Sequence, residues 1–479
     1  MLFNSFDFAL FLPIFFVLYW FVTKKKIKAQ NLLICIASYI FYGWWNWRFL
    51  SLIIFSSSVD YIVGIYLAKT NNQKRRKLLL LTSILVNIGL LGFFKYFNFF
   101  TQSFADSFTL LGKEIDPFRL NIILPVGISF YTFQTLSYSI DVYKRKLEPT
   151  KDIIAFFAFV SFFPQLVAGP IERATNLLPQ FYNRRNFDYN KAIDGLGQIL
   201  WGLLKKMVIA DNCALYANTI FNNFPSYSSS TLLLGAFFFA FQIYGDFSGY
   251  SDISIGTAKL FGFKLMRNFA FPYFSRDIAE FWRRWHISLS TWFRDYVYIP
   301  LGGSQVNKWM KIRNTMIIFI VSGFWHGANW TFIIWGFLNA LFFLPLLLYN
   351  RNRKHIDIVA KDKYLPSIRE FFSILLTFSL TTFSWIFFRA TSIKHAMDYI
   401  AGIIDISLFS FPEMMEIRLM IITALFILVE WQGRENKYAI EGIFKNNVPE
   451  PLKWSCLYLI ALIIFLFAGQ QQEFIYFQF

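Results

Sequence analysis

Long apolar stretches separated by short basic clusters run through the whole of this 479-residue chain. A bilayer core about 30 Å thick is crossed by about 20 apolar residues in a helix, and many of the stretches approach that length. Hydrophobic residues make up 56% of the chain and charged residues only 16%. The sequence therefore predicts an all-α polytopic membrane protein, with a multi-pass location in a lipid bilayer.

The basic clusters predict which ends of the spans face the cytoplasm. A net charge of +17 is also typical of proteins that bind nucleic acid. Here the positive-inside rule explains the charge more simply, so we expect no nucleic-acid partner. The first three clusters follow the first, third and fifth predicted spans, which end near residues 22, 68 and 141, and they place the N-terminus outside. They consist of Lys24, Lys25, Lys26 and Lys28; Lys69, Lys74, Arg75, Arg76 and Lys77; and Lys144, Arg145 and Lys146.

Counting the apolar stretches gives about 11–12 transmembrane helices in a single membrane domain covering 1–479. The last span and an acceptor-like tail make up 453–479, and a count of twelve crossings, an even number, places the tail beyond residue 470 outside the cytoplasm as well. The segment 152–170 is broken by proline and glycine and predicts a re-entrant element. The basic region 259–313 predicts a cytoplasmic or interfacial surface. The three cysteines are too widely spaced for a metal site or a disulfide framework, and we expect no metal.

His326 stands at an unusual depth in the predicted bilayer. It lies in GFWHGANW (323–330), within an apolar run that begins after Arg313. Thirteen helical residues rise about 20 Å, which carries His326 well into the hydrocarbon core. An ionisable side chain at that depth indicates a functional site by default. The alternative is a structural imidazole that is hydrogen-bonded between helices.

The segment 275–303 mixes tryptophans with arginines and is typical of a helix lying at the membrane interface. Its Arg283 and Arg284 could contact lipid headgroups or bind phosphate groups of an anionic donor. His286 follows them and could share a site with His326. Two carboxylates, Asp246 and Asp252, could line a polar vestibule, but they are interpreted as structural hydrogen-bond partners for Arg or His within the bundle.

Four motifs occur in a characteristic order: FFPQLVAGPIERA (162–174), GDFSGYSDISIGTAKLFGF (245–263), RRWHISLSTWFRDYVYIPLGG (283–303) and GFWHGANW (323–330). Together they resemble the membrane-bound O-acyltransferase family. The similarity is strongest to its bacterial branch, which acts in alginate and peptidoglycan O-acetylation and in the D-alanylation of teichoic acids. The resemblance implies core motifs over 160–336, a central funnel, a catalytic His326 and a partner at His286.

The resemblance also implies a reaction. An acyl thioester, with acetyl-CoA favoured, would bind from the cytoplasmic side without any permanently bound cofactor. Arg283, Arg284 and Trp285 are the expected donor-binding residues, and neutral His326 would act as a general base on the incoming hydroxyl. His286 could orient the donor or help to protonate the thiolate leaving group.

The chain ends in FIYFQF (474–479), which predicts either an aromatic interfacial anchor or an acyl acceptor. In the D-alanylation relatives a similar ending belongs to a small partner protein whose tyrosine is thought to receive the acyl group. The resemblance therefore implies that Tyr476 takes the acyl group. It would then pass the group to an extracytoplasmic SGNH-type transferase or another acceptor protein.

Three functions compete at this point. The first is an enzyme of the bacterial cytoplasmic (inner) membrane that delivers acetyl groups for O-acetylation of an external polysaccharide or peptidoglycan. The second is the same enzyme with D-alanine or another acyl group. The third is a proton-coupled transporter, which is less favoured because the sequence shows no paired broken helices of an inverted repeat.

Overall fold

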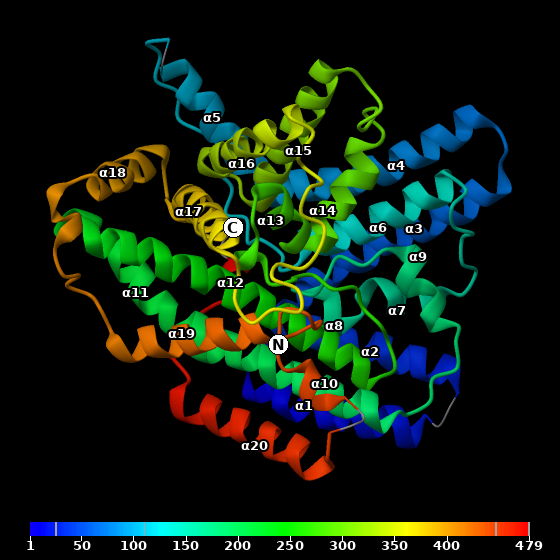
Figure 1. The fold of residues 1–479 in the computed structure, drawn as a ribbon. Helices are drawn as coiled ribbons and strands as arrows, with labels where there is room; N and C mark the ends of the chain where they lie inside the picture. Colours follow the sequence, from blue (N-terminus) through cyan, green and yellow to red (C-terminus); the bar gives the residue numbers. More distant parts are fainter. Residues whose placement is uncertain (24–25, 110, 446–447, 478–479) are drawn as a thin grey trace. The chain divides into compact units, whose positions relative to one another are not determined.

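The computed structural model describes residues 1–23, 26–109, 111–445 and 448–477, and all regular structure within these ranges is helical (Figure 1). The expected all-α fold is thereby confirmed for the described part of the chain. Lys24 and Lys25 of the first basic cluster, and Gln478 and Phe479 of the C-terminal motif, lie outside these residues.

Six helical stretches among the described residues are long and apolar enough to cross a membrane, so this is a multi-pass membrane protein. They are Ile27–Lys69, Gln73–Thr109, Ser229–Leu260, Trp330–Leu348, Ile368–Arg389 and Glu450–Phe467, with shorter apolar helices at Phe6–Val22 and Ile153–Leu166. The first stretch has 43 residues, about twice what one crossing needs. It breaks at Asn46, whose backbone is extended, so it can supply two crossings. The total of 11–12 spans stays a prediction.

The chain divides into two compact units, 1–188 with 258–265 and 189–257 with 266–479. The single domain expected from the sequence therefore stays a prediction. The motif 162–174 belongs to the first unit, whereas His286, His326 and Tyr476 all belong to the second.

In the first unit a buried carboxylate joins three helices: α3 (Leu50–Lys69), α4 (Gln73–Leu91) and α6 (Ile128–Tyr143). Asp60 on α3 accepts hydrogen bonds from Ser83, from Asn87 Nδ2 at 2.8 Å and from Ser139 Oγ at 2.6 Å. These polar contacts specify the packing of helices that are otherwise apolar. The segment expected to re-enter forms two short buried helices, α7 (Ile153–Ser161) and α8 (Phe163–Leu166), and the expected break is confirmed.

The second unit is built around α12 (Ser229–Leu260), much of which is buried. Its other long helices are α10 (Tyr189–Leu203), α11 (Asp211–Asn222), α15 (Lys308–His326), α16 (Trp330–Leu348), α17 (Ile368–Arg389), α18 (Ile393–Ile403), α19 (Ile417–Gln432) and α20 (Glu450–Phe467). α15 and α16 lie side by side (Figure 1). Their backbones approach so closely that a Cβ added to Gly323 would lie 2.2 Å from the Phe332 carbonyl oxygen. Glycine at such a crossing lets two membrane helices touch.

Candidate active site

His326 is the last residue of α15, and the motif GFWHGANW forms the turn from α15 into α16. The helix ends there because Gly327 is extended, with φ −158° and ψ 150°. Asn329 then begins α16 by accepting a hydrogen bond from the Thr331 N–H. The His326 side chain is 3% exposed, so the structure encloses it as the apolar sequence around it predicts.

His286 lies between two short helices, α13 (Ile278–Arg284) and α14 (Ile287–Phe293), which are too short to cross a membrane. It has a left-handed backbone with φ 43°, a conformation that costs a non-glycine residue of order 1–3 kcal/mol. Backbone hydrogen bonds on both sides hold it there, from Ile287 N to the Asn268 carbonyl and from Ala270 N to the Arg284 carbonyl, each 2.9 Å. The conformation turns the His286 ring into the protein, where it is 1% exposed.

The rings of His286, His326 and Tyr476 meet in the second unit. The centroid of Tyr476 lies 5.5 Å from that of His326 and 6.4 Å from that of His286, and the two imidazoles are 6.4 Å apart. Phe247 of α12 packs on both Tyr476, at 4.3 Å, and His286, at 4.6 Å. Three residues that are far apart in the sequence thus form one cluster with a shared aromatic wall.

Tyr476 reaches this cluster because the chain turns back after α20 into the middle of the second unit (Figure 1). The residue is half-buried, but its phenol oxygen is fully enclosed. Burial, with a smaller contribution from the negative charge of Asp246, raises the pKa of the phenol well above its ordinary value. The hydroxyl therefore keeps its proton near neutral pH, and a base is required before it can act as a nucleophile.

The side chain of Asn268 determines which ring nitrogen of His286 carries the proton. The Asn268 side-chain oxygen accepts from Ser288 N at 3.2 Å and from Ser288 Oγ at 2.8 Å, and its amide nitrogen donates to Ser251 Oγ at 3.0 Å. That oxygen lies 3.1 Å from His286 Nδ1, which must then carry the proton. Nε2 of His286 is buried without a hydrogen-bond partner among the described residues. Burial lowers the pKa of His286 to about 3, so Nε2 offers a lone pair.

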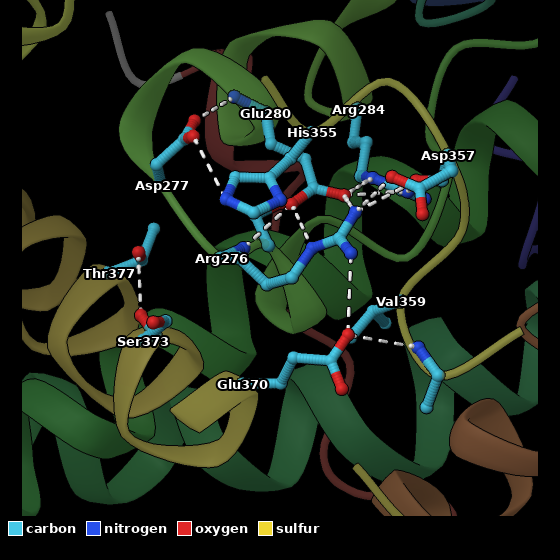
Figure 2. Close-up of polar contacts among 12 residues, drawn as sticks. Arg276, Asp277, Glu280, Arg284, His355, Asp357, Val359, Glu370, Ser373 and Thr377 are labelled. Atoms are coloured by element: carbon cyan, nitrogen blue, oxygen red, sulfur yellow. Dashed lines mark hydrogen bonds and ion pairs between the residues drawn. The ribbon is translucent and has the colours of Figure 1, made fainter. Parts of the chain in front are cut away.

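The two predicted donor-binding arginines bind the loop that follows α16. Arg283 donates to the Asn352 carbonyl at 2.7 Å and the His355 carbonyl at 2.6 Å, while Arg284 donates to the Asp357 carbonyl at 2.8 Å. Figure 2 shows Arg284 next to Arg276 in a network of ion pairs. Arg283 is exposed. A role for either arginine in donor binding stays a prediction.

Within that network (Figure 2), Arg276 binds Glu280 on α13 at 3.0 Å and Asp357 at 2.9 Å. The guanidinium of Arg276 lowers the pKa of the Asp357 carboxyl. The network ties the loop after α16 to the short helix that precedes His286. It therefore supports the backbone that carries the second imidazole.

Trp285 lies in the interior, where it is 1% exposed. Its ring centroid lies 5.5 Å from that of Phe281, 5.1 Å from that of Phe269 and 5.1 Å from that of Trp385. These contacts make Trp285 a core residue next to His286. This position does not test whether Trp285 binds the donor, so that role stays a prediction.

The two carboxylates of the motif 245–263 have structural partners, but their partners are lysines of the turn between α10 and α11. Asp246 pairs with Lys206 at 2.9 Å, and Asp252 pairs with Lys205. These lysines were not predicted as part of a site, although the sequence carries a signal for them. Two adjacent lysines within the apolar stretch 195–212 are as unusual in a membrane as His326.

Comparison with known proteins identifies the family of this chain. The family model described as MBOAT, membrane-bound O-acyltransferase family, matches residues 39–387. A protein named "Probable alginate O-acetylase AlgI" from Pseudomonas syringae pv. tomato is 40% identical over 84% of this chain and 74% of its own length. A peptidoglycan O-acetyltransferase of Helicobacter pylori is 33% identical over 100% of this chain and 98% of its own length. A teichoic acid D-alanyltransferase of Bacillus subtilis is 29% identical over 57% of this chain and 71% of its own length.

These matches decide between the competing classes in favour of an enzyme and against a transporter. The family model covers well over half of the chain, including the segments that carry His286 and His326. This multi-pass membrane protein is an O-acyltransferase that belongs to the membrane-bound O-acyltransferase family.

Proposed function

We propose that this enzyme transfers acetyl groups from a cytoplasmic thioester, acetyl-CoA, to an extracytoplasmic polysaccharide or peptidoglycan in the bacterial cytoplasmic membrane. The observation that carries the proposal is the convergence of His286, His326 and Tyr476 on one enclosed cluster. An acetyl group is favoured because the relatives named for O-acetylation match more of this chain, at higher identity, than the D-alanyltransferases do.

In the proposed reaction the Tyr476 phenol is the first acceptor. His326 removes the phenol proton while the phenol oxygen forms a bond to the acyl carbon of the thioester. The carbon–sulfur bond then breaks, and the proton passes from the His326 imidazolium to the departing thiolate. The products are free CoA and an aryl ester on Tyr476. The ester is more reactive than an alkyl ester, and a separate extracytoplasmic transferase of the SGNH type moves the acyl group on to the glycan.

His286 has a different part from His326. Its Nδ1 is protonated toward Asn268, and burial keeps the ring neutral at physiological pH. A neutral ring without a proton on Nε2 cannot protonate a thiolate, so we assign His286 to accepting a hydrogen bond. The group that donates this bond is the Tyr476 hydroxyl or a polar group of the donor. This assignment replaces protonation of the leaving group, one of the two roles left open by the sequence.

The donor's phosphates need cationic partners on the cytoplasmic side. Exposed Arg283 is the best placed of the three predicted donor-binding residues, because its guanidinium can bind further acceptors beyond two loop carbonyls. Arg284 and Trp285 support the site through the network and the aromatic core around His286.

The function is tested with purified protein in lipid nanodiscs and isotope-labelled acetyl-CoA. Mass spectrometry should find an acetyl adduct on the C-terminal peptide that contains Tyr476. In cells, deletion of the gene should lower the acetyl-ester content of envelope polymers, and the intact gene should restore it. Labelling from a D-alanyl carrier protein, with none from acetyl-CoA, would assign the enzyme to D-alanyl transfer.

A further inference from the structure

Hydrogen bonds along its length join the C-terminal tail, residues 467–477, to the rest of the second unit. Gly469 N donates to the Met207 carbonyl at 2.8 Å, and Asn212 Nδ2 donates to the Phe467 carbonyl at 3.0 Å. Nearer the end, Lys206 Nζ donates to the Gln472 carbonyl at 3.0 Å and Ile475 N donates to Asp246 Oδ2 at 2.7 Å. The last of these bonds is adjacent to Tyr476.

The binding site for the tail begins with an irregularity in the helix that joins α10 to α11. Residues Leu204–Ala210 form a π-helical turn, a form that is rare and often found at functional sites. The wider turn alters the backbone hydrogen bonding, and the Met207 carbonyl accepts a bond from Gly469. A side chain at position 469 would bring its Cβ to 3.0 Å from the backbone nitrogen of Asn212. Glycine therefore suits this close approach.

The tail is held mainly by a buried ionic cluster, which consists of Lys206, Asp211 and Asp246. Lys206 Nζ lies 2.7 Å from Asp211 Oδ1 and 2.9 Å from Asp246 Oδ1, and all three side chains are almost completely buried. The two carboxylates share one ammonium group, and Asp246 has a second oxygen, Oδ2, that also needs a partner. The Ile475 N–H supplies it by donating to Asp246 Oδ2. A buried charge needs such partners, and here the tail backbone supplies one.

We propose that Lys206, Asp211 and Asp246 are positioning residues that hold the tail so that the Tyr476 phenol is presented to His326 and His286. The proposal rests on the function proposed above and deepens it. A tyrosine fixed by its neighbouring backbone is delivered to the donor without the entropy cost of a free acceptor. The cluster touches the tail through Gln472 and Ile475, so it acts on the reaction through the tail.

The structure supplies a matched control in the adjacent ion pair. Lys205 and Asp252 stand on the same two elements as Lys206 and Asp246, and Lys205 donates to Asp252 and to Ser248 Oγ. Among the described residues, the hydrogen bonds of Lys205 and Asp252 involve no residue of the tail. Lys206→Gln and Asp246→Asn would be compared with Lys205→Gln and Asp252→Asn. Each variant removes one charge from a buried pair.

Two measurements on the full-length protein in nanodiscs test the proposal. Hydrogen–deuterium exchange should become faster in the C-terminal peptide of the Lys206 and Asp246 variants, but not in peptides from α15 and α16. The rate of Tyr476 acetylation from acetyl-CoA should fall by at least about tenfold in the same variants, because small misplacements of a reacting group are costly. The KM for acetyl-CoA should not change, Lys206→Arg should recover part of the rate, and the controls should match the wild type.

The possible failures are distinguishable. Unchanged exchange in the tail of Lys206→Gln and Asp246→Asn would overturn the anchor. Faster exchange with an acetylation rate equal to that of the controls would show an anchor without a positioning role, and would also overturn the proposal. Absence of the Tyr476 adduct in the wild-type protein would overturn the proposed relay itself, whatever the exchange data show.

Discussion

The ring of Tyr476 lies 5.5 Å from the ring of His326, although one residue belongs to the C-terminal tail and the other ends α15. The proposed general base and the proposed acceptor hydroxyl lie on two separate segments, and they meet because the tail turns back into the second unit. The family resemblance pointed to His326, and this distance pairs it with Tyr476. The pair can be tested residue by residue.

Tyr476→Phe should abolish acyl transfer while the protein stays folded. Phenylalanine keeps the ring that packs at 4.3 Å on Phe247 but removes the nucleophilic oxygen. The stability should change by less than about 1.5 kcal/mol, as in other volume-conserving substitutions. Thermal unfolding in detergent and labelled-acetyl transfer in nanodiscs check both points. Tyr458→Phe on α20 is the control, because Tyr458 is 70% exposed. Near-normal transfer by Tyr476→Phe would reduce the tail to an anchor.

His326→Ala should lower the acyl-transfer rate by about 10²–10⁴-fold, the usual contribution of a general base. The substitution removes the imidazole that faces Tyr476 and leaves the turn between α15 and α16 in place. His286→Ala should be less severe, since His286 is assigned a hydrogen bond and no proton transfer. His395→Ala on α18 is the control, because His395 Nε2 lies 3.1 Å from the Phe221 carbonyl, outside the cluster of three rings. Wild-type rates in a well-folded His326→Ala protein would reject the assignment.

The membrane helices and the enclosed position of His326 could be predicted because each leaves a local signal in the sequence. An apolar stretch of sufficient length specifies a span by itself, and an imidazole within such a stretch is conspicuous. The turn directly after His326 was not predicted, although Gly327 and Asn329 are residue types that often end and begin helices.

The remainder of the site depends on contacts between distant segments, which a single sequence does not display. Asn268, in the irregular segment after α12, contacts His286, and Lys206, in the π-helical turn between α10 and α11, pairs with Asp246 on α12. Neither spacing corresponds to a helical or a strand period, so no local pattern links the partners. Asp246 was expected to be structural, and its ion pair with Lys206 agrees with that interpretation.

Gly336→Ala should destabilise the protein by about 1–3 kcal/mol, the usual cost of overpacking. A Cβ at this position would lie 2.3 Å from the Phe319 carbonyl oxygen, so α15 and α16 would have to move apart. Because α15 ends at His326, acyl transfer should fall as well. Gly89→Ala in α4 is the matched control, since a Cβ there meets nothing within 4 Å. Alanine at that position should be neutral or stabilise by up to about 1 kcal/mol. Equal unfolding temperatures for the two variants would contradict the packing argument.

Asn268→Asp should introduce a pH dependence of acyl transfer that comes from His286 and that the wild-type enzyme lacks. In the wild type, burial lowers the pKa of His286 to about 3, so the ring is neutral at every pH at which the protein can be assayed. A carboxylate facing Nδ1 favours the imidazolium and should raise that pKa by about 1–3 units. A raised pKa means that protonation increases as the pH falls, and a protonated His286 cannot accept a hydrogen bond at Nε2.

Acyl transfer by Asn268→Asp should therefore decline as the pH is lowered from about 7 to about 4, because a pKa raised by about 1–3 units from about 3 lies at about 4–6. It should recover when the pH is raised again. The rate profile of the wild type should show no loss from His286 over that range. Asn314→Asp is the control: Asn314 is also a buried asparagine, but its amide donates to the Leu301 carbonyl at the other end of α15. If Asn268→Asp and Asn314→Asp show the same pH profile, the effect comes from a buried carboxylate in general, and Asn268 does not set the protonation of His286.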